Sequence, residues 1–193
     1  MPRAGGKITI LRDAGCKRAD DELIATAGKL KAPIAFAHRG KEFIEYDNPF
    51  NVGMTGLFGF SSGYQAIMDC DVLLMLGTDF PYPQFYPEKA TLNEVDIRSK
   101  QIGLRTQVEV GLIGDVKSTL RAPSPLLFDK ADRSHVDKTL AHYLRAMKNL
   151  GALATGKEGT SPLHPQFVVA TIDKVAAEDA IFTCDVGRPH WSG

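Results

Sequence analysis

The chain has 193 residues, of which 44% are hydrophobic and 24% are charged. These are ordinary values for a globular protein, and a chain of this length buries about 70% of its unfolded surface without needing a disulfide or a metal. Its 23 basic and 23 acidic residues give a net charge of zero, which argues against a main role in binding nucleic acid or an anionic membrane.

The cysteines and the apolar runs indicate which cellular compartment and which kinds of cysteine bonding to expect. Cys16, Cys70 and Cys184 form no Cys-x-x-Cys motif, so we expect reduced, buried thiols rather than a disulfide framework or a zinc site. The longest apolar runs, near residues 72–76, are far below the roughly 20 residues that span a bilayer. Residues 1–6 are too few and too polar for a signal peptide. We therefore expect a cytoplasmic protein without a membrane span.

From residue 7 onward, short apolar runs alternate with helical patterns, which is typical of a parallel α/β sheet. The apolar runs predict strands at 8–11, 34–37, 72–76, 94–97, 108–113 and 180–184. Helices are predicted from residue 20 to just before Pro33, and at 61–68, 115–120, 134–151 and 165–176. Because the strands are so apolar, we expect helices on both faces of a mostly parallel sheet of about six strands.

Two polar stretches interrupt this alternation. Residues 39–63 are rich in glycine and too long for an ordinary connection, which predicts a working loop. Residues 151–162 mix glycine, serine, threonine and charge, as linkers do. A helix and a strand are predicted after this linker. We therefore expect one domain over 1–155, and a linker with the truncated start of a second domain over 156–193.

Glycine and aspartate recur directly after the predicted strands, at 13–15, 38–40, 77–80, 96–97 and 114–115. In open parallel sheets, ligands bind at the carboxyl ends of the strands. Glycine lets a phosphate or ribose approach the backbone there, and aspartate accepts hydrogen bonds from ribose hydroxyls. Each signal alone is equally typical of a turn. Their recurrence after successive strands predicts a nucleotide site.

Several common signatures of cofactor binding and catalysis are absent from the sequence. It contains no Gly-x-Gly-x-x-Gly, no Walker loop and no His-x-x-x-His. Of the histidines, only His38 is predicted to follow a strand directly, where both a cofactor contact and a structural role in the loop are open. No catalytic or metal-binding residue is assigned.

Residues 40–63 resemble the middle domain of thiamine-diphosphate-dependent enzymes, most closely that of pyruvate oxidase and quinone-linked pyruvate dehydrogenase. The similarity continues through residues 76–82, 85–87, 95–97, 102–103 and 114–120. Residues 164–166 and 181–187 resemble the entry to the diphosphate-binding domain of the same enzymes. The resemblance implies a three-layer, Rossmann-like (DHS-like) fold for residues 1–155.

The same resemblance implies that the domains of the parent enzyme have different roles. Such enzymes have three domains, and thiamine diphosphate and magnesium bind through the other two, so we expect this chain to bind neither and to be inactive by itself. The expected partners are the remaining domains of the parent enzyme. Assembly of this chain into a homo-oligomer is left open.

In the oxidase branch the middle domain binds FAD, with its ADP half over the carboxyl edge of the sheet. The strand ends and the resemblance together give these candidate cofactor-binding residues: Gly15, His38, Arg39, Gly53, Met54, Thr55, Gly56, Gly77, Thr78, Asp79, Phe80, Pro81, Asp96, Ile97, Gly114 and Asp115. Asp13 stands where that branch usually has glycine, and Pro83 where close relatives carry arginine. An added carboxylate repels a pyrophosphate, so we expect FAD to bind weakly or not at all.

Three functions remain open from the sequence. The first is a fragment of a pyruvate oxidase or dehydrogenase, whose central domain is a scaffold and a candidate FAD site. The second is the structural central domain of an acetolactate-synthase-like carboligase or acyltransferase that binds no FAD, which Asp13 and Pro83 favour. The third is a free-standing nucleotide-binding module.

Overall fold

The computed structural model describes residues 6–44, 47–156, 159 and 161–183. The chain divides into two compact units, Met1–Met147 and Lys148–Gly193. The first unit contains a six-stranded sheet and its helices, and the second contains the end of helix α5 and helix α6. The domain boundary predicted near residue 155 falls within the second unit.

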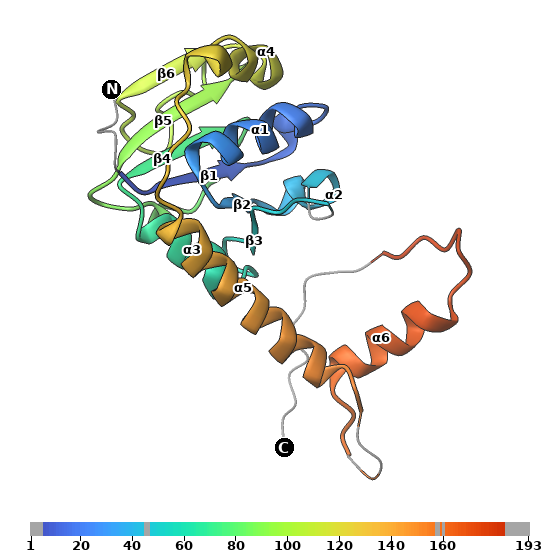
Figure 1. Ribbon diagram of the computed structural model, residues 1–193. Coiled ribbons are helices and arrows are strands. Elements are labelled where there is room, and N and C mark those ends of the chain that lie inside the picture. Colours follow the sequence, from blue (N-terminus) through green and yellow to red (C-terminus); the bar gives the residue numbers. More distant parts are fainter. Residues whose placement is uncertain (1–5, 45–46, 157–158, 160, 184–193) are drawn as a thin grey trace. The chain divides into compact units, whose positions relative to one another are not determined.

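The sheet consists of six parallel strands in the order β3-β2-β1-β4-β5-β6 (Figure 1). The strands are β1 Ile8–Arg12, β2 Ile34–Phe36, β3 Asn51–Met54, β4 Val72–Leu76, β5 Thr91–Asp96 and β6 Val110–Ile113. From β1 the chain proceeds outward to β3, and then returns to the opposite side of β1 as β4. The order of the strands therefore reverses between β1 and β4.

Helices cover both faces of the sheet (Figure 1), which confirms the expected three-layer α/β fold. The helices are α1 Asp20–Leu30, α2 Lys41–Ile44, α3 Ser61–Met68, α4 Val116–Arg121, α5 Ser134–Leu153 and α6 Pro165–Val175. Neighbouring residues of a strand point to opposite faces. Ile10 accordingly packs in one buried cluster with Leu23 of α1 and Leu120 of α4, whereas Leu11 packs in a second cluster with Ile67 of α3.

Five of the six predicted strands form, with ends shifted by a few residues. The strand predicted at 180–184 is wrong for its described residues, 180–183, which have no regular structure. Ile181 and Phe182 are 90% and 61% exposed, and within the described part of the chain residues 180–183 pair with no strand of the sheet.

The one strand of the sheet that the sequence does not predict is β3, which lies inside residues 39–63, the stretch expected to be a working loop. Its sequence, Asn-Val-Gly-Met, is short and contains residues that are rare in strands. It forms because β2 lies beside it and pairs with both of its ends. Gly53, in the middle of the strand, has a φ of +92°, a value that glycine adopts most readily. Pairing with a neighbour therefore outweighs poor strand propensity here.

The expectation that both faces of every strand are covered by helices is wrong for β6. All four residues of this edge strand are exposed, and Val110, Leu112 and Ile113 are 46%, 47% and 67% exposed. The edge has a neighbour on one side only, which is β5. The other strands are buried as predicted.

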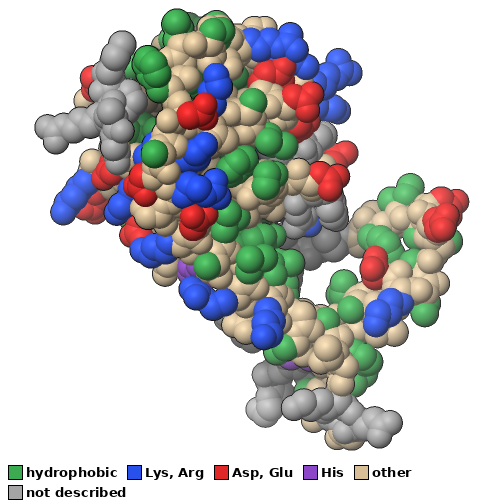
Figure 2. Space-filling view, viewed as in Figure 1, with side chains coloured by type: hydrophobic (Ala, Val, Ile, Leu, Met, Phe, Trp, Pro, Cys, Tyr) green, Lys and Arg blue, Asp and Glu red, His purple; other side chains and the backbone are tan. Residues whose placement is uncertain are grey.

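The remaining general expectations concern thiols, charge and membranes. Cys16 and Cys70 are free and buried, as expected, and Cys184 lies outside the described residues. Acidic and basic side chains are interspersed on the face shown in Figure 2, in keeping with the zero net charge. Within the described part of the chain, no helix has both the length and the hydropathy needed to cross a bilayer.

A buried histidine joins α5 to the central strand. His135 is 3% exposed, and its Nε2 lies 2.9 Å from the hydroxyl oxygen of Thr9. That hydroxyl donates its own proton to the carbonyl of Ala66, so Nε2 must carry the hydrogen in this pair. Burial lowers the pKa of His135 to about 4, and the charges of Lys7 and Lys130 act in the same direction.

This histidine should make the protein less stable in mild acid. Its pKa in the unfolded chain is about 6.5, so between pH 6.5 and 4 the unfolded state binds a proton that the folded state does not. Stability is then complete above pH 6.5 and is lost as the pH falls. We expect the free energy of unfolding, measured in urea, to drop by about 1 to 2 kcal/mol between pH 7.5 and 5.5.

The variant His135→Gln keeps a donor for Thr9 and should remove most of this pH dependence. The matched control is His164→Gln, because His164 is exposed and its replacement should leave the dependence unchanged. An equal loss of stability with pH in the His135→Gln variant would contradict the assignment.

Candidate functional site

A cavity of about 290 Å³ opens at the carboxyl edge of the sheet, over the ends of β1, β4, β5 and β6. It includes the place where the strand order reverses, which is the usual ligand site of open parallel sheets. Its lining residues are Asp13, Ala14, Gly15, Arg39, Gly77, Asp79, Asp96, Ile97, Arg98, Gly114, Asp115 and Val116. We refer to this cavity as the switch-point cleft.

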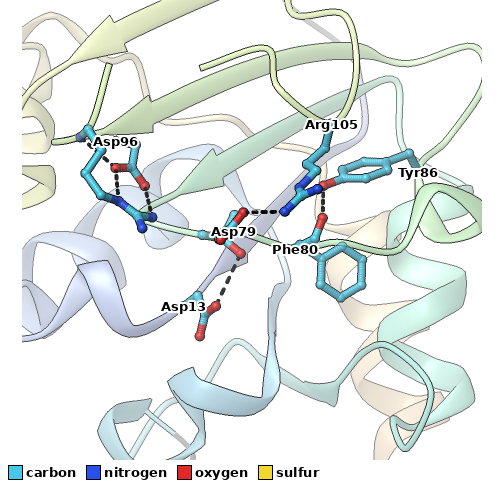
Figure 3. A network of polar contacts seen from close by, with 8 residues as sticks. Asp13, Asp79, Phe80, Tyr86, Asp96 and Arg105 are labelled. Carbon is cyan, nitrogen blue, oxygen red and sulfur yellow. Dashed lines mark hydrogen bonds and ion pairs between the residues drawn. The ribbon is translucent and has the colours of Figure 1, made fainter. Parts of the chain in front are cut away.

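Half of the candidate residues from the sequence meet in this cleft: Gly15, Arg39, Gly77, Asp79, Asp96, Ile97, Gly114 and Asp115. The other half do not line it: His38, Gly53, Met54, Thr55, Gly56, Thr78, Phe80 and Pro81. Phe80 is 2% exposed and packs against aromatic rings, and its carbonyl accepts a hydrogen bond from Tyr86 (Figure 3). Met54 packs against the buried cluster that contains Ile10.

The floor of the cleft is a direct contact between two glycines. The N–H of Gly15 donates to the carbonyl of Gly77 over 3.0 Å. A Cβ placed on Gly15 would lie 2.5 Å from the Cα of Gly77. Gly77 also has a φ of +54°, which disfavours other residues. The turns after β1 and β4 therefore touch without any side chain between them.

Two of the aspartates in the cleft are paired with arginines (Figure 3). Asp96, which is 2% exposed, accepts two hydrogen bonds from the guanidinium of Arg98, over 3.1 and 3.2 Å. Asp79 pairs with Arg105 over 3.2 Å. The pair of Asp96 and Arg98 is bidentate, and such pairs hold both side chains in a fixed geometry. The carboxylate of Asp96 is therefore already occupied by Arg98.

The other two aspartates interact with the backbone. Asp115 begins α4 and accepts the N–H of Ser118 over 2.9 Å, and this interaction lowers the pKa of Asp115. Asp13 is 7% exposed and accepts a long hydrogen bond of 3.5 Å from Thr78. Burial raises the pKa of Asp13, and the N–H of Ala14 and the charge of Arg39 counteract that rise.

The sequence-based site omitted several residues that line the cleft. Arg98 follows Asp96 by two positions, and a cation that close to a strand-end aspartate is the signal that indicates such a pair. Ala14 and Val116 are apolar and carry no such signal. Asp13 belongs to the strand-end segment 13–15 but is not among the candidate cofactor-binding residues, and it is one of the buried polar residues of the cleft.

The polar groups that line the cleft come from aspartates, arginines and the backbone. Among the described residues that line it there is no histidine, cysteine, serine or lysine. Likewise, no group of three or more candidate metal ligands occurs in the part of the chain that the structure describes. The available chemistry is hydrogen bonding to carboxylates, two guanidinium groups and backbone atoms.

This architecture agrees with the family comparison. Residues 3–122 match the model of a family described as thiamine pyrophosphate enzyme, central domain. The chain belongs to this family. The matched range covers all six strands and α1 to α4, so it includes every residue that lines the switch-point cleft.

The chain is similar to parts of longer proteins. A 42.6 kDa protein from the isoamylase 3′ region of Pseudomonas amyloderamosa is 50% identical over 81% of this chain and 40% of its own length. YdaP of Bacillus subtilis, whose name describes it as thiamine pyrophosphate-containing, is 34% identical over 94% of this chain and 31% of its own length. The chain thus spans well under half the length of these relatives.

Relatives named for an activity fall into several classes. A probable acetolactate synthase large subunit of Methanocaldococcus jannaschii is 28% identical, over 96% of this chain and 32% of that protein. The pyruvate oxidase of Lactiplantibacillus plantarum is 25% identical (90% and 29%), and a sulfoacetaldehyde acetyltransferase of Roseovarius nubinhibens is 30% identical (91% and 33%). The expected special closeness to pyruvate oxidase is therefore not supported beyond family membership.

The glycine contact gives a stability prediction. In Gly15→Ala the new methyl group would meet the backbone of Gly77, which cannot move without disturbing β4. We expect the free energy of unfolding to fall by about 2 kcal/mol or more in urea denaturation. The control is Gly151→Ala, where no atom lies within 4 Å of the added Cβ and a helical alanine should stabilise by about 0.5 to 1 kcal/mol. Equal stability of Gly15→Ala and the wild type would contradict the tight contact.

Proposed function

We propose that this chain acts as the scaffold-forming central domain of a thiamine-diphosphate-dependent enzyme of the carboligase or acyltransferase kind. Its residues contribute a rigid parallel sheet and a ligand cleft, and thiamine chemistry takes place on other domains of the parent enzyme. The observation that carries this proposal is the composition of the switch-point cleft. Its described lining residues offer four carboxylates and two guanidinium groups, and no histidine, cysteine, serine or lysine lies among them.

The charges of the cleft oppose the binding of FAD, the cofactor that an oxidase would need. Four carboxylates line the cleft, from Asp13, Asp79, Asp96 and Asp115, against the two guanidinium groups of Arg39 and Arg98. Arg98 is already paired with Asp96. A diphosphate brings further negative charge, which this surplus of carboxylates repels. The residues present therefore do not fit the diphosphate of FAD.

A pyruvate oxidase or pyruvate dehydrogenase is the second candidate. It is favoured by the resemblance of residues 40–63 and by the similarity to the L. plantarum enzyme. In that case FAD would have to lie against the candidate residues despite the four carboxylates. A yellow flavin that stays with the purified chain through gel filtration would favour this candidate over the first.

The scaffold role is tested by calorimetric titration of the purified chain with thiamine diphosphate and Mg²⁺. We expect no binding and no consumption of pyruvate, because the sequence lacks a Gly-Asp-Gly motif and a set of metal ligands is absent from the described residues. Tight binding of thiamine diphosphate would contradict the scaffold role. That result would not depend on how the cleft treats adenine nucleotides.

A further inference from the structure

The turn after β1, residues 13–17, uses four of its five backbone donors within the protein. An anion at such a turn is normally held by several N–H groups. Here four of these groups donate to carbonyls of the protein: Asp13 to Leu76 (3.2 Å), Gly15 to Gly77 (3.0 Å), Cys16 to Asp13 (2.9 Å) and Lys17 to Ala14 (3.1 Å). The fifth, that of Ala14, lies next to Asp13 and acts to lower the pKa of its carboxyl.

The carboxylate of Asp13 is buried at this turn. It is 7% exposed, one of its oxygens accepts a long hydrogen bond of 3.5 Å from the hydroxyl of Thr78, and the other has no hydrogen-bond partner among the described residues. The charges of Arg39 and Arg12 act to lower the pKa of this carboxyl, against the effect of its burial. The same donors and cations would otherwise attract a phosphate. The protein therefore supplies its own anion at the switch point.

We propose that Asp13 determines the ligand specificity of the switch-point cleft, because its carboxylate takes the place of a ligand diphosphate at the turn. The cleft then excludes ADP and FAD, although its position in the sheet is that of a nucleotide site. This inference rests on the proposed function only in taking the cleft as the ligand site. It attributes the exclusion of ADP and FAD to the side chain of Asp13, whereas the total charge of the cleft only suggests that exclusion.

The test compares the wild-type chain with Asp13→Gly and Asp13→Asn in calorimetric titrations with ADP and FAD. The backbone at Asp13 is extended, with φ of −146°, so both replacements fit the conformation. Removal of the carboxylate takes away a negative charge close to the N–H of Ala14 and to the guanidinium of Arg39. We expect both variants to bind ADP at least about tenfold more tightly than the wild type, the usual gain from a charge-assisted hydrogen bond.

The matched control is Asp79→Asn, which removes one carboxylate from the same cleft but leaves the β1 turn intact. Asp79 is partly exposed and paired with Arg105, so its replacement should change ADP affinity by less than about threefold. An equal gain in Asp79→Asn and Asp13→Asn would show that net charge, rather than the position of Asp13, controls binding, and would overturn the proposal.

Two further results would also overturn it. One is tight binding of ADP or FAD by the wild-type chain. The other is failure of both Asp13 variants to bind more tightly than the wild type while their thermal unfolding shows that they are folded. Because the wild-type titration requires no variant, the proposal can be refuted even if a replacement impairs folding. None of these outcomes bears on thiamine diphosphate binding, so they leave the test of the scaffold role separate.

Discussion

The contact between Gly15 and Gly77 is the constraint on which the carboxyl edge of the sheet depends. β1 and β4 are adjacent, central strands, and their following turns meet with no side chain between them. This contact sets the floor of the switch-point cleft and fixes the course of the chain after both strands. The N–H of Gly15 is consumed in it, so the geometry of the floor also decides which hydrogen-bond donors remain for a ligand.

The electrostatic character of the cleft follows from this geometry. Because four of the five turn amides are satisfied within the protein, the polar groups left to a ligand are mostly side chains, and most of these are carboxylates. Asp96 is matched by Arg98, and Asp79 by Arg105. Asp13 is instead embedded in the turn itself. A site whose position suits a nucleotide is thus unfavourable for the phosphates that most nucleotides carry.

The same central domain serves relatives that are named for different activities. A shared sheet can support such a range because the fold and the chemistry are separable, and function resides in sites that the fold carries. For this chain the cleft is the part of the fold where such differences can arise. The identity of residue 13 is then a local change with consequences for ligand choice, made without altering the sheet.

The sequence alone determined the fold class, five of the six strands and half of the residues that were expected to form the site. Apolar runs and helical periodicity are local properties, and the recurrence of glycine and aspartate after successive strands identifies the carboxyl edge.

Only the tertiary structure decided the rest. β3 exists because β2 lies beside it, and residues 180–183 form no strand because nothing pairs with them. The role of Asp13 depends on its burial in the cleft and on a hydrogen bond from Thr78, which joins segments that the sequence separates by 65 positions. Pairings of this kind are set by packing, which no local pattern encodes.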